Sequence, residues 1–217
     1  MRADADRWNR KYAKGAAYRP FSPDPLLERM RERLRLHSRS VGGGRLLELA
    51  CGRADNAILG AMCGYRATGV DISETGLRLA RGNAARFGLA LEWLTADLDD
   101  YTLPIAHYDV VLVFRYLNRE LFAGLAEALR PGGLLVYKTF NRAHLDRHPG
   151  FPEDFVLQPG ELRGQFEGLQ LVATNEPAGG LPESDTSSYL VAARPAVESP
   201  APGLSWRTIE HREKRRP

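Results

Sequence analysis

Long apolar stretches and cysteines are both scarce in this chain of 217 residues. No apolar run approaches the ~18 residues that a membrane-spanning helix needs, so we expect no membrane segment. The first ten residues are polar and lack the apolar centre of a secretion signal. Only two cysteines occur, Cys51 and Cys63, in a chain large enough to fold without disulfides. This favours a reducing, cytoplasmic location.

The net charge of +3 is small, but it is unevenly distributed along the chain. Residues 1–45 hold twelve basic against five acidic side chains, a net charge of +7. Residues 46–204 hold thirteen against twenty, a net charge of −7, and the last thirteen residues carry +3. A basic arm can follow phosphates, but solvated helix faces usually have this composition as well. The pattern therefore disfavours a nucleic-acid partner without excluding it.

Apolar residues recur with two alternating periods, which predicts strands separated by helices. The expected strands are Leu46–Ala50, Arg66–Asp71, Leu91–Thr95, Tyr108–Phe114 and Leu134–Phe140, followed by two near 170–174 and 188–193. The expected helices of this part are Asp55–Cys63, Ser73–Phe87 (capped by Ser73), Arg119–Leu129 (ended by a Pro131–Gly133 turn) and, after a long loop, one near Pro159–Phe166. We predict an α/β, Rossmann-like doubly wound sheet of five parallel strands plus a C-terminal antiparallel pair, with helices on both faces.

The length suits one domain with two flanking segments. Residues 1–40 are expected to form a helical segment, with a short helix from Trp8 to Tyr12 and a second that Asp24 caps and Pro25 begins. The main domain should cover residues 41–194. Residues 195–217 are predicted to be a Pro-rich linker and a basic, flexible tail.

A turn of small residues follows the first expected strand, in Glu48-Leu-Ala-Cys-Gly52. Ligands of a doubly wound sheet bind beyond the carboxyl ends of its strands, and small residues there let backbone N–H groups approach them. Asp71 ends the second strand nineteen residues after Gly52, where a carboxylate can accept hydrogen bonds from ribose hydroxyls. Alternatively, Glu48 and Asp71 only cap neighbouring helices. The turn lacks the G-x-G-x-x-G pattern, which disfavours a nicotinamide dehydrogenase.

Five segments resemble, in order and spacing, the successive motifs of class I S-adenosylmethionine-dependent methyltransferases over about residues 40–194. They are Glu48-Leu-Ala-Cys-Gly52, Val70-Asp-Ile-Ser73, Thr95-Ala-Asp-Leu98, Tyr108–Phe114 and Leu129-Arg-Pro-Gly-Gly133. The first segment of the chain, with Trp8-Asn-Arg-Lys-Tyr12 and Pro23-Asp-Pro-Leu-Leu27, looks like the small tellurite-resistance and thiopurine methyltransferase group. That likeness implies an N-terminal segment that folds over the bound cofactor.

The resemblance implies S-adenosylmethionine as cofactor, S-adenosylhomocysteine as product, and a set of cofactor-binding residues. Glu48 would lie near the methionine amino group, Gly52 under the methionine moiety, and Asp71 on the ribose. Ile72 would pack on the adenine, and Asp97 would accept a hydrogen bond from its amino group. The other cofactor-binding candidates are Trp8, Tyr12, Ala50, Cys51, Ala96, Leu98, Phe114 and Arg115.

Some of these positions depart from the family's usual residues, and others have an alternative structural role. The family usually has glycines where Ala50 and Ala54 stand, and Ala54 would put a methyl group near the closest backbone approach to the cofactor. Trp8 and Tyr12 fall on one helical face and would either cap the cofactor or staple the helix to the domain. Cys51 is interpreted as a small packing residue rather than a nucleophile.

The acceptor side is expected where the fourth and fifth strands end, with Arg115, Tyr116, Arg142 and His144 as catalytic candidates. Arg115 would bind an anionic acceptor, or the cofactor's carboxylate, unless it is a solvated loop residue. Tyr116 would wall the pocket or fill core, and His144 would be a base or an ordinary loop histidine. Arg115 and Arg142 would make the mouth positive, which favours an easily deprotonated acceptor. No metal site is expected: His144 and His148 lie four residues apart, but Pro149 and Gly150 follow directly, which disfavours a metal-binding pair.

These features favour an enzyme that methylates a small soft or anionic acceptor, of the thiol or chalcogen-oxyanion type. One alternative is a protein or RNA methyltransferase that uses the basic N-terminal helix and tail. Another is a non-catalytic domain that binds the cofactor as a sensor or partner subunit. The acceptor-side rim lacks the Asn-Pro-Pro-Tyr pattern of many nucleic-acid amino methyltransferases, which disfavours base modification. The acceptor's identity and the oligomeric state, monomer or homodimer, stay open.

Overall fold

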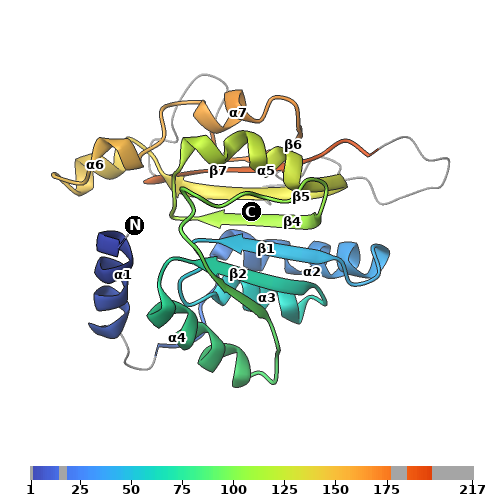
Figure 1. Ribbon diagram of the computed structural model, residues 1–217. Coiled ribbons are helices and arrows are strands. Elements are labelled where there is room, and N and C mark those ends of the chain that lie inside the picture. Colours follow the sequence, from blue (N-terminus) through green and yellow to red (C-terminus); the bar gives the residue numbers. More distant parts are fainter. Residues whose placement is uncertain (1, 15–18, 177–184, 197–217) are drawn as a thin grey trace, which may run out of the picture.

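The computed structural model describes residues 2–14, 19–176 and 185–196, and its strands form one sheet of seven in the order β3-β2-β1-β4-β5-β7-β6 (Figure 1). The strands are β1 Arg45–Leu49, β2 Arg66–Asp71, β3 Glu92–Thr95, β4 Tyr108–Phe114, β5 Leu129–Phe140, β6 Gln170–Thr174 and β7 Ser187–Ala193. The first five strands run parallel, whereas β7 is antiparallel to both β5 and β6. The predicted fold class is therefore confirmed.

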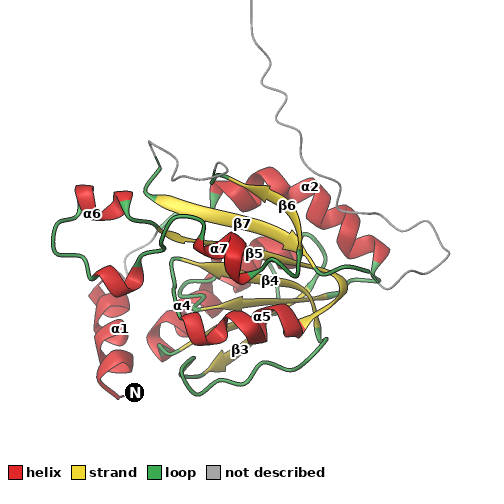
Figure 2. Cartoon of the chain, turned by 90° about the horizontal axis from the view of Figure 1, so that it is seen from above, coloured by secondary structure: helices red, strands yellow, loops and turns green. Residues whose placement is uncertain are grey.

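Helices cover both faces of this sheet. The α-helices are α1 Arg2–Lys14, α2 Pro25–Ser40, α3 Asp55–Met62, α4 Glu74–Ala85, α5 Phe122–Ala128, α6 Ala143–Arg147 and α7 Glu161–Gln165, with short 3-10 turns η1 Arg119–Leu121 and η2 Glu153–Phe155. One core cluster joins α2, α3 and α4 to the sheet, and a second joins α5 and α7 to the other face. Figure 2 shows α2 and α5 on opposite sides of the strands. β4 is buried along its whole length because both of its faces are covered.

Two helix starts agree with the predicted caps. The carboxylate of Asp24 accepts a hydrogen bond from the backbone N–H of Leu26 at 2.9 Å, and Pro25 occupies the first helical position. The hydroxyl of Ser73 accepts from the N–H of Gly76 at 3.0 Å at the start of α4. These caps satisfy backbone donors that a first helical turn leaves without partners.

The expected turn at Pro131–Gly133 is wrong, since these residues lie inside β5. Gly132 N–H donates to the carbonyl of Arg194 at 2.9 Å, and Arg194 N–H donates to the carbonyl of Gly133 at 2.9 Å. A Cβ at Gly133 would lie 2.9 Å from the Arg130 carbonyl oxygen, so glycine permits the irregular register there. Pairing with a residue about sixty positions away overrides the local turn signal.

Three other boundaries differ from expectation. The helix expected over 119–129 is split into η1 and α5, and the loop expected after β5 contains α6 and η2. Helix α1 extends well beyond Trp8–Tyr12 in both directions. The predicted tail lies outside the described residues from position 197 onward. In the described part, no helix is long and apolar enough to span a bilayer.

Candidate functional site

The carboxyl ends of β1, β2, β4 and β5 meet at one edge of the sheet, where α1 and α6 also lie (Figure 1). β1 pairs with β2 on one side and with β4 on the other, so the strand order reverses between β1 and β4. Ligands of open α/β sheets bind at such a switch point. We call this the ligand edge. The fold brings the predicted cofactor residues and Arg115 to it from separate segments.

The turn after β1 is built from left-handed backbone. Gly52 has φ +54°, and Ala50 and Ala54 have φ values of +50° and +57°. An L-residue resists this conformation by ~1–2 kcal/mol, which explains why glycines are usual at these positions. The side chain of Ala54 is 1% exposed and belongs to the core cluster under α2 and α3. Its methyl group therefore lies in the core rather than at the ligand edge.

Asp71 joins this turn to α4. One carboxylate oxygen accepts from the backbone N–H of Gly52 at 2.7 Å, and the other accepts from the N–H of Ser73 at 2.8 Å. Burial raises the pKa of Asp71, while these two N–H donors act in the opposite direction by favouring the charged form. Each carboxylate oxygen has two lone pairs, so each retains one for a further donor.

Glu48 lies below the turn and faces α3. It accepts from the side-chain amide of Asn56 at 2.9 Å and from the N–H of Ala57 at 2.8 Å. Burial raises the pKa of Glu48 to about 8, although both donors lower it. The structure thus gives Glu48 the helix-fixing contacts of the alternative interpretation. Cys51 is also buried, and burial raises the pKa of its thiol, so the thiol is protonated at neutral pH.

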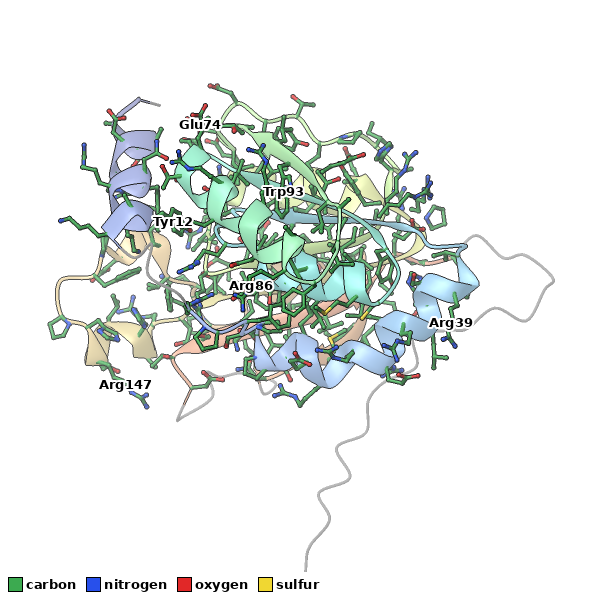
Figure 3. The ribbon with its side chains drawn as sticks, turned by 90° about the horizontal axis from the view of Figure 1, so that it is seen from below. Tyr12, Arg39, Glu74, Arg86, Trp93 and Arg147 are labelled. Atoms are coloured by element: carbon green, nitrogen blue, oxygen red, sulfur yellow. The ribbon has the colours of Figure 1, made fainter. Side chains whose placement is uncertain are left out.

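Helix α1 brings Tyr12 directly over this turn. A Cβ at Gly52 would collide with the Tyr12 hydroxyl, and one at Gly76 would lie 3.0 Å from the Tyr12 ring. Figure 3 shows Tyr12 between α1 and α4. Burial, followed by the charge of Asp71, raises the pKa of the Tyr12 phenol. Trp8 stacks on Tyr12 with ring centroids 6.0 Å apart, so both predicted capping residues lie at the ligand edge.

The segment after β3 lies beside Asp71, as the predicted adenine contacts require. Ala96 N–H donates to the Asp71 carbonyl at 3.1 Å. Asp97 is half-buried and accepts from the N–H of Asp99 at 3.1 Å, and Leu98 is buried. Ile72, which directly follows Asp71, is half-buried. Residues 96–107, all within the described part, contain no helix, which leaves this segment to form the rim itself.

Arg115 and Tyr116 follow the buried Phe114 at the end of β4, and Arg115 is strained. It has φ +56° although it is not glycine, its side chain is exposed, and its N–H donates to the Lys138 carbonyl at 2.8 Å. Burial raises the pKa of Tyr116 to about 12, and nearby Asp97 and Asp99 add to the rise. The rim therefore carries both charges, since the carboxylates of Asp97 and Asp99 lie near Tyr116 and the predicted arginines are Arg115 and Arg142.

The other predicted acceptor residues lie on α6. Arg142 is exposed at the helix start, whereas His144 stacks on Phe140 with ring centroids 4.0 Å apart. Phe151 meets the His144 ring edge-on with centroids 4.8 Å apart, and the ring of His148, which directly follows α6, lies 4.3 Å from that of His144. Burial lowers the pKa of His144, as does His148. Nδ1 of His144 has no hydrogen-bond partner within the described residues.

Contacts that the sequence did not indicate fasten the segment before α2 to this edge. Both carboxylate oxygens of Asp24 accept from Lys138 Nζ at 3.1 Å, and Asp24 N–H donates to Asn56 at 2.7 Å. Arg19 forms an ion pair with Asp55 in the first turn of α3. Each pair joins residues more than thirty positions apart, so no local sequence signal could have indicated it.

Arg119 similarly holds the acceptor side together. Its guanidinium donates twice to the carboxylate of Glu161, at 2.6 and 3.1 Å. It also donates to the carbonyls of Asp154 at 2.9 Å and Val156 at 3.1 Å. The loop between α6 and α7 is thus tied to the segment that follows Tyr116. Only a planar guanidinium can make this set of bonds, which a lysine could not replace.

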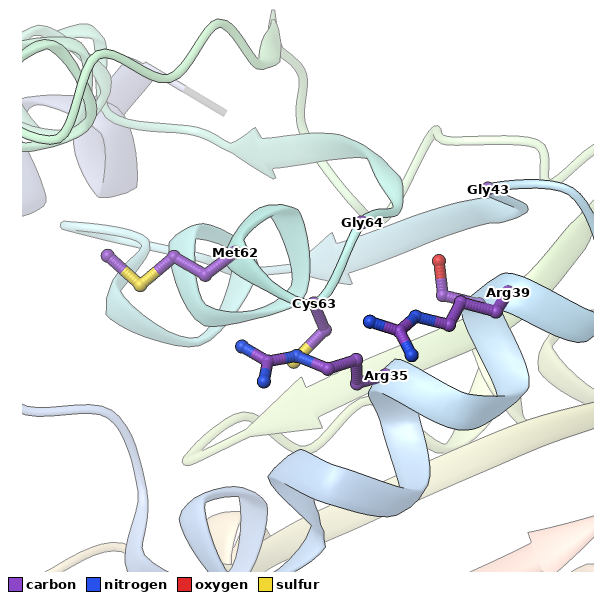
Figure 4. A pocket seen from close by; sticks show the side chains of 7 residues that line it. Arg35, Arg39, Gly43, Met62, Cys63 and Gly64 are labelled. Atoms are coloured by element: carbon purple, nitrogen blue, oxygen red, sulfur yellow. The ribbon is translucent and has the colours of Figure 1, made fainter.

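Two hollows in the described structure lie away from the ligand edge. One, of about 310 Å³, is lined by Arg35, Ser38, Arg39, Gly43, Met62, Cys63 and Gly64 (Figure 4). Its residues precede β1 and β2, at the amino ends of the strands. The other lies by α5 and α7. No group of three or more His, Cys, Asp or Glu side chains that could hold a metal occurs among the described residues.

Comparison with known proteins matches residues 46–133 to the family described as a methyltransferase domain. The chain is 27% identical over 109 residues to a ubiquinone biosynthesis O-methyltransferase of Bordetella avium, covering 48% of this chain and 45% of that protein. It is 28% identical over 152 residues to an S-adenosyl-L-methionine-dependent Diels-Alderase of Talaromyces variabilis, covering 66% and 50%. The chain thus spans about half the length of these relatives.

Among solved structures, TehB from Haemophilus influenzae superimposes with a TM-score of 0.60 at 18% identity. The superposition covers 75% of this chain and 62% of that one. At this identity the likeness concerns the fold alone. The turn after β1 and the acidic end of β2 both fall within residues 46–133, which match the methyltransferase domain family.

Proposed function

We propose that the protein is a class I S-adenosylmethionine-dependent methyltransferase that methylates a small acceptor with a soft or anionic nucleophile, since residues 46–133 match the methyltransferase domain family. The observation that carries the proposal is the junction of Gly52 with Asp71 at the switch point of the sheet. Because the chain spans about half of its relatives, their acceptors are not transferred to it.

The residues at the ligand edge fit S-adenosylmethionine. Each Asp71 oxygen retains a lone pair for a ribose hydroxyl, and the Tyr12 hydroxyl occupies the space beside Gly52 that a Cβ would take, where it can cover a bound methionine moiety. We assign the adenine to Ile72 and the segment Ala96–Leu98, and the methionine moiety to the turn from Ala50 to Gly52. When bound, the cofactor supplies a methyl group already activated by its sulfonium. The protein's residues have only to bind, orient and exclude water.

We propose that the N-terminal segment, residues 1–40, covers the bound cofactor. Tyr12 lies on the turn and Trp8 stacks outside it, which supports the capping role that the likeness to the tellurite-resistance and thiopurine group implies. The contacts of Asp24 with Lys138 and of Arg19 with Asp55 hold the next segment against β5 and α3, respectively. A cover of this kind would keep water from the reacting centre and leave the acceptor an approach between α1 and α6.

For the acceptor, we propose a thiol or a chalcogen oxyanion, bound with the help of Arg115 and Arg142. Guanidinium groups favour the ionised form of an acid, so they would lower the pKa of such an acceptor as it binds. Tyr116 would form one wall. A protonated acceptor would need a base, and His144 is neutral at pH 7 because burial lowers its pKa. The acceptor atom must come within about 3–3.5 Å of the methyl carbon.

The test is a transfer assay with S-adenosylmethionine labelled in its methyl group. A panel of thiols and chalcogen oxyanions is compared with bulk RNA and protein as acceptors. Label in the small molecules supports the proposal, whereas label only in RNA or protein supports the macromolecular alternative. Binding without transfer to any acceptor would place the chain with cofactor-binding proteins that do not methylate, an alternative that the Diels-Alderase relative keeps relevant.

Arg115→Lys tests the acceptor side, with Arg142→Lys as the matched variant. An ammonium cannot reproduce the planar fork, so we expect Arg115→Lys to raise the acceptor KM roughly tenfold, the effect of losing ~1.4 kcal/mol. Affinity for S-adenosylhomocysteine should stay unchanged. If cofactor affinity falls instead, Arg115 serves the methionine carboxylate. If neither quantity moves in either variant, the anionic-acceptor proposal is wrong.

A further inference from the structure

We propose that Asn9 is a positioning residue that locks helix α1 onto α4 and thereby sets how slowly the cofactor leaves. This inference rests on the proposed function, because the cofactor is taken to bind under Tyr12. It concerns a residue that does not itself reach the turn at Gly52. Its effect passes through Tyr12, which lies three residues further along the same helix face.

The side-chain oxygen of Asn9 makes two hydrogen bonds at the beginning of α4. It accepts from the hydroxyl of Ser73 at 2.8 Å and from the backbone N–H of Thr75 at 3.0 Å. The Ser73 hydroxyl accepts in turn from Gly76 N–H at 3.0 Å. The first N–H groups of a helix have no partner within that helix, so Asn9 completes the cap that Ser73 begins. Helix α1 is thus hydrogen-bonded to α4 at a fixed point.

These bonds continue without a break to the cofactor turn. The N–H groups of Ser73 and Gly52 donate to the two oxygens of the same Asp71 carboxylate, at 2.8 and 2.7 Å. The order is therefore Asn9, Ser73, Asp71 and Gly52. A displacement of α1 at Asn9 is transmitted to the residues that would hold the ribose and the methionine moiety.

Tyr12 fits a slot that two glycines leave open. A Cβ at Gly52 would collide with its hydroxyl, and a Cβ at Gly76 would come within 3.0 and 3.1 Å of two ring carbons. Gly76 lies inside α4, where alanine is the better helix former. Space for the Tyr12 ring explains why glycine occupies this helical position. Elsewhere on the same helix, Gly82 is exposed and has no heavy atom within 4 Å of its Cβ position.

These contacts give α1 one defined position on α4. Asn9 fixes the rotation of the helix, and Tyr12 covers the turn at Gly52. Trp8 belongs to the same contact region, because its ring stacks on Tyr12. The Nζ of Lys11 lies 4.2 Å from the centroid of the Trp8 ring. A cofactor bound under Tyr12 can leave only after α1 moves away from α4. The hydrogen bonds of Asn9 add to that barrier, and so they slow dissociation.

The experiment measures release of S-adenosylhomocysteine by stopped flow, its affinity by calorimetry, and the melting temperature. The wild-type chain is measured first, and failure to bind S-adenosylhomocysteine would overturn the proposed function itself. Asn9→Leu should raise the dissociation rate about tenfold, the scale of losing two neutral hydrogen bonds. Asn9→Asp should restore slow release, because a carboxylate accepts the same two bonds and suits a helix N-terminus.

Gly76→Ala and Gly82→Ala form a matched pair on α4. Gly76→Ala should displace the Tyr12 ring and speed release several-fold, and the melting temperature should stay near that of wild type, because the helix preference of alanine offsets the close contacts of its Cβ with the Tyr12 ring and the Gly52 carbonyl oxygen. Gly82→Ala should leave release unchanged. This pair tests the closure by Tyr12 even if Asn9→Leu folds poorly. Release at the wild-type rate in both Asn9→Leu and Gly76→Ala would overturn the inference.

Trp8 provides a signal that a merely structural role for Asn9 would not change. The chain has three tryptophans, so a Trp93→Phe, Trp206→Phe background isolates its emission. Asn9→Leu should shift that emission toward the spectrum of solvent-exposed tryptophan, and Asn9→Asp should reverse the shift. An unchanged Trp8 spectrum in Asn9→Leu would mean that α1 keeps its position on α4 without Asn9, which contradicts the proposal.

Discussion

Replacing Ala54 by glycine separates two effects of the unusual turn after β1. Ala54 has φ +57°, a conformation that costs an L-residue ~1–2 kcal/mol and glycine almost nothing. Glycine gives back ~0.5–1 kcal/mol because it gains more freedom in the unfolded chain. Ala54 is also 1% exposed, so losing its methyl group removes about 0.8 kcal/mol of apolar burial. The three terms nearly cancel.

Ala106→Gly is the matched control, because Ala106 has φ +47° but an exposed side chain. Only the backbone terms remain there, so we expect a gain of about 0.5–1 kcal/mol, or roughly 1–4 °C in melting temperature for a chain of this size. Ala54→Gly should stay within about 2 °C of wild type. Calorimetric melting of both variants measures the difference.

The same variants test where the Ala54 methyl group lies. Because it packs in the core cluster with α2 and α3, its removal should leave affinity for S-adenosylhomocysteine within about twofold, a difference of ~0.4 kcal/mol. If Ala54→Gly binds this ligand more than about fivefold tighter, a gain of ~1 kcal/mol, the methyl group obstructs the cofactor and this reasoning is wrong. A loss of stability in Ala106→Gly would refute the strain argument.

Two further predictions concern the buried carboxylates. Asp71→Asn should weaken S-adenosylhomocysteine binding by ~1.5–3 kcal/mol in calorimetry and lower the melting temperature by several degrees, because an amide accepts from only one of the two N–H donors; unchanged affinity would refute the ribose assignment. Burial raises the pKa of Glu48 from 4.5 to about 8. Between these pH values the folded protein therefore keeps a proton on Glu48 that the unfolded chain has lost. As a result, the contribution of Glu48 makes the free energy of unfolding fall as pH rises. Urea unfolding across this range should show a weaker fall in Glu48→Gln, and parallel profiles would contradict the assignment.

Local patterns were sufficient wherever the interactions are local. The apolar runs predicted the strands, and the Asp24 and Ser73 caps were predicted because a capping side chain bonds to the backbone within three residues. The position of Asp71 beside the turn followed from spacing, since parallel neighbouring strands end at the same edge. The expected glycine-like turn was also visible, although alanines occupy two of its positions.

The expectations that failed involve partners distant in sequence. Pro131–Gly133 looked like a turn, yet pairing with Arg194 draws it into β5. The positive mouth at Arg115 and Arg142 stays a prediction, and the loop after β3 adds carboxylates to it, those of Asp97 and Asp99 near Tyr116. The path of that loop depends on packing that no residue in it determines alone.

By itself, the sequence determined the α/β sheet, the turn after β1 and the acidic end of β2, because periodicity and spacing act over a few residues or between adjacent strands. Only the tertiary structure decided that Glu48 holds α3, that Arg119 ties down the acceptor side and that Asn9 caps a helix more than sixty residues away. These roles depend on which side chains meet when helices dock. Docking is set by the burial of whole faces, so the hydrogen bonds that follow from it leave no pattern in the local sequence.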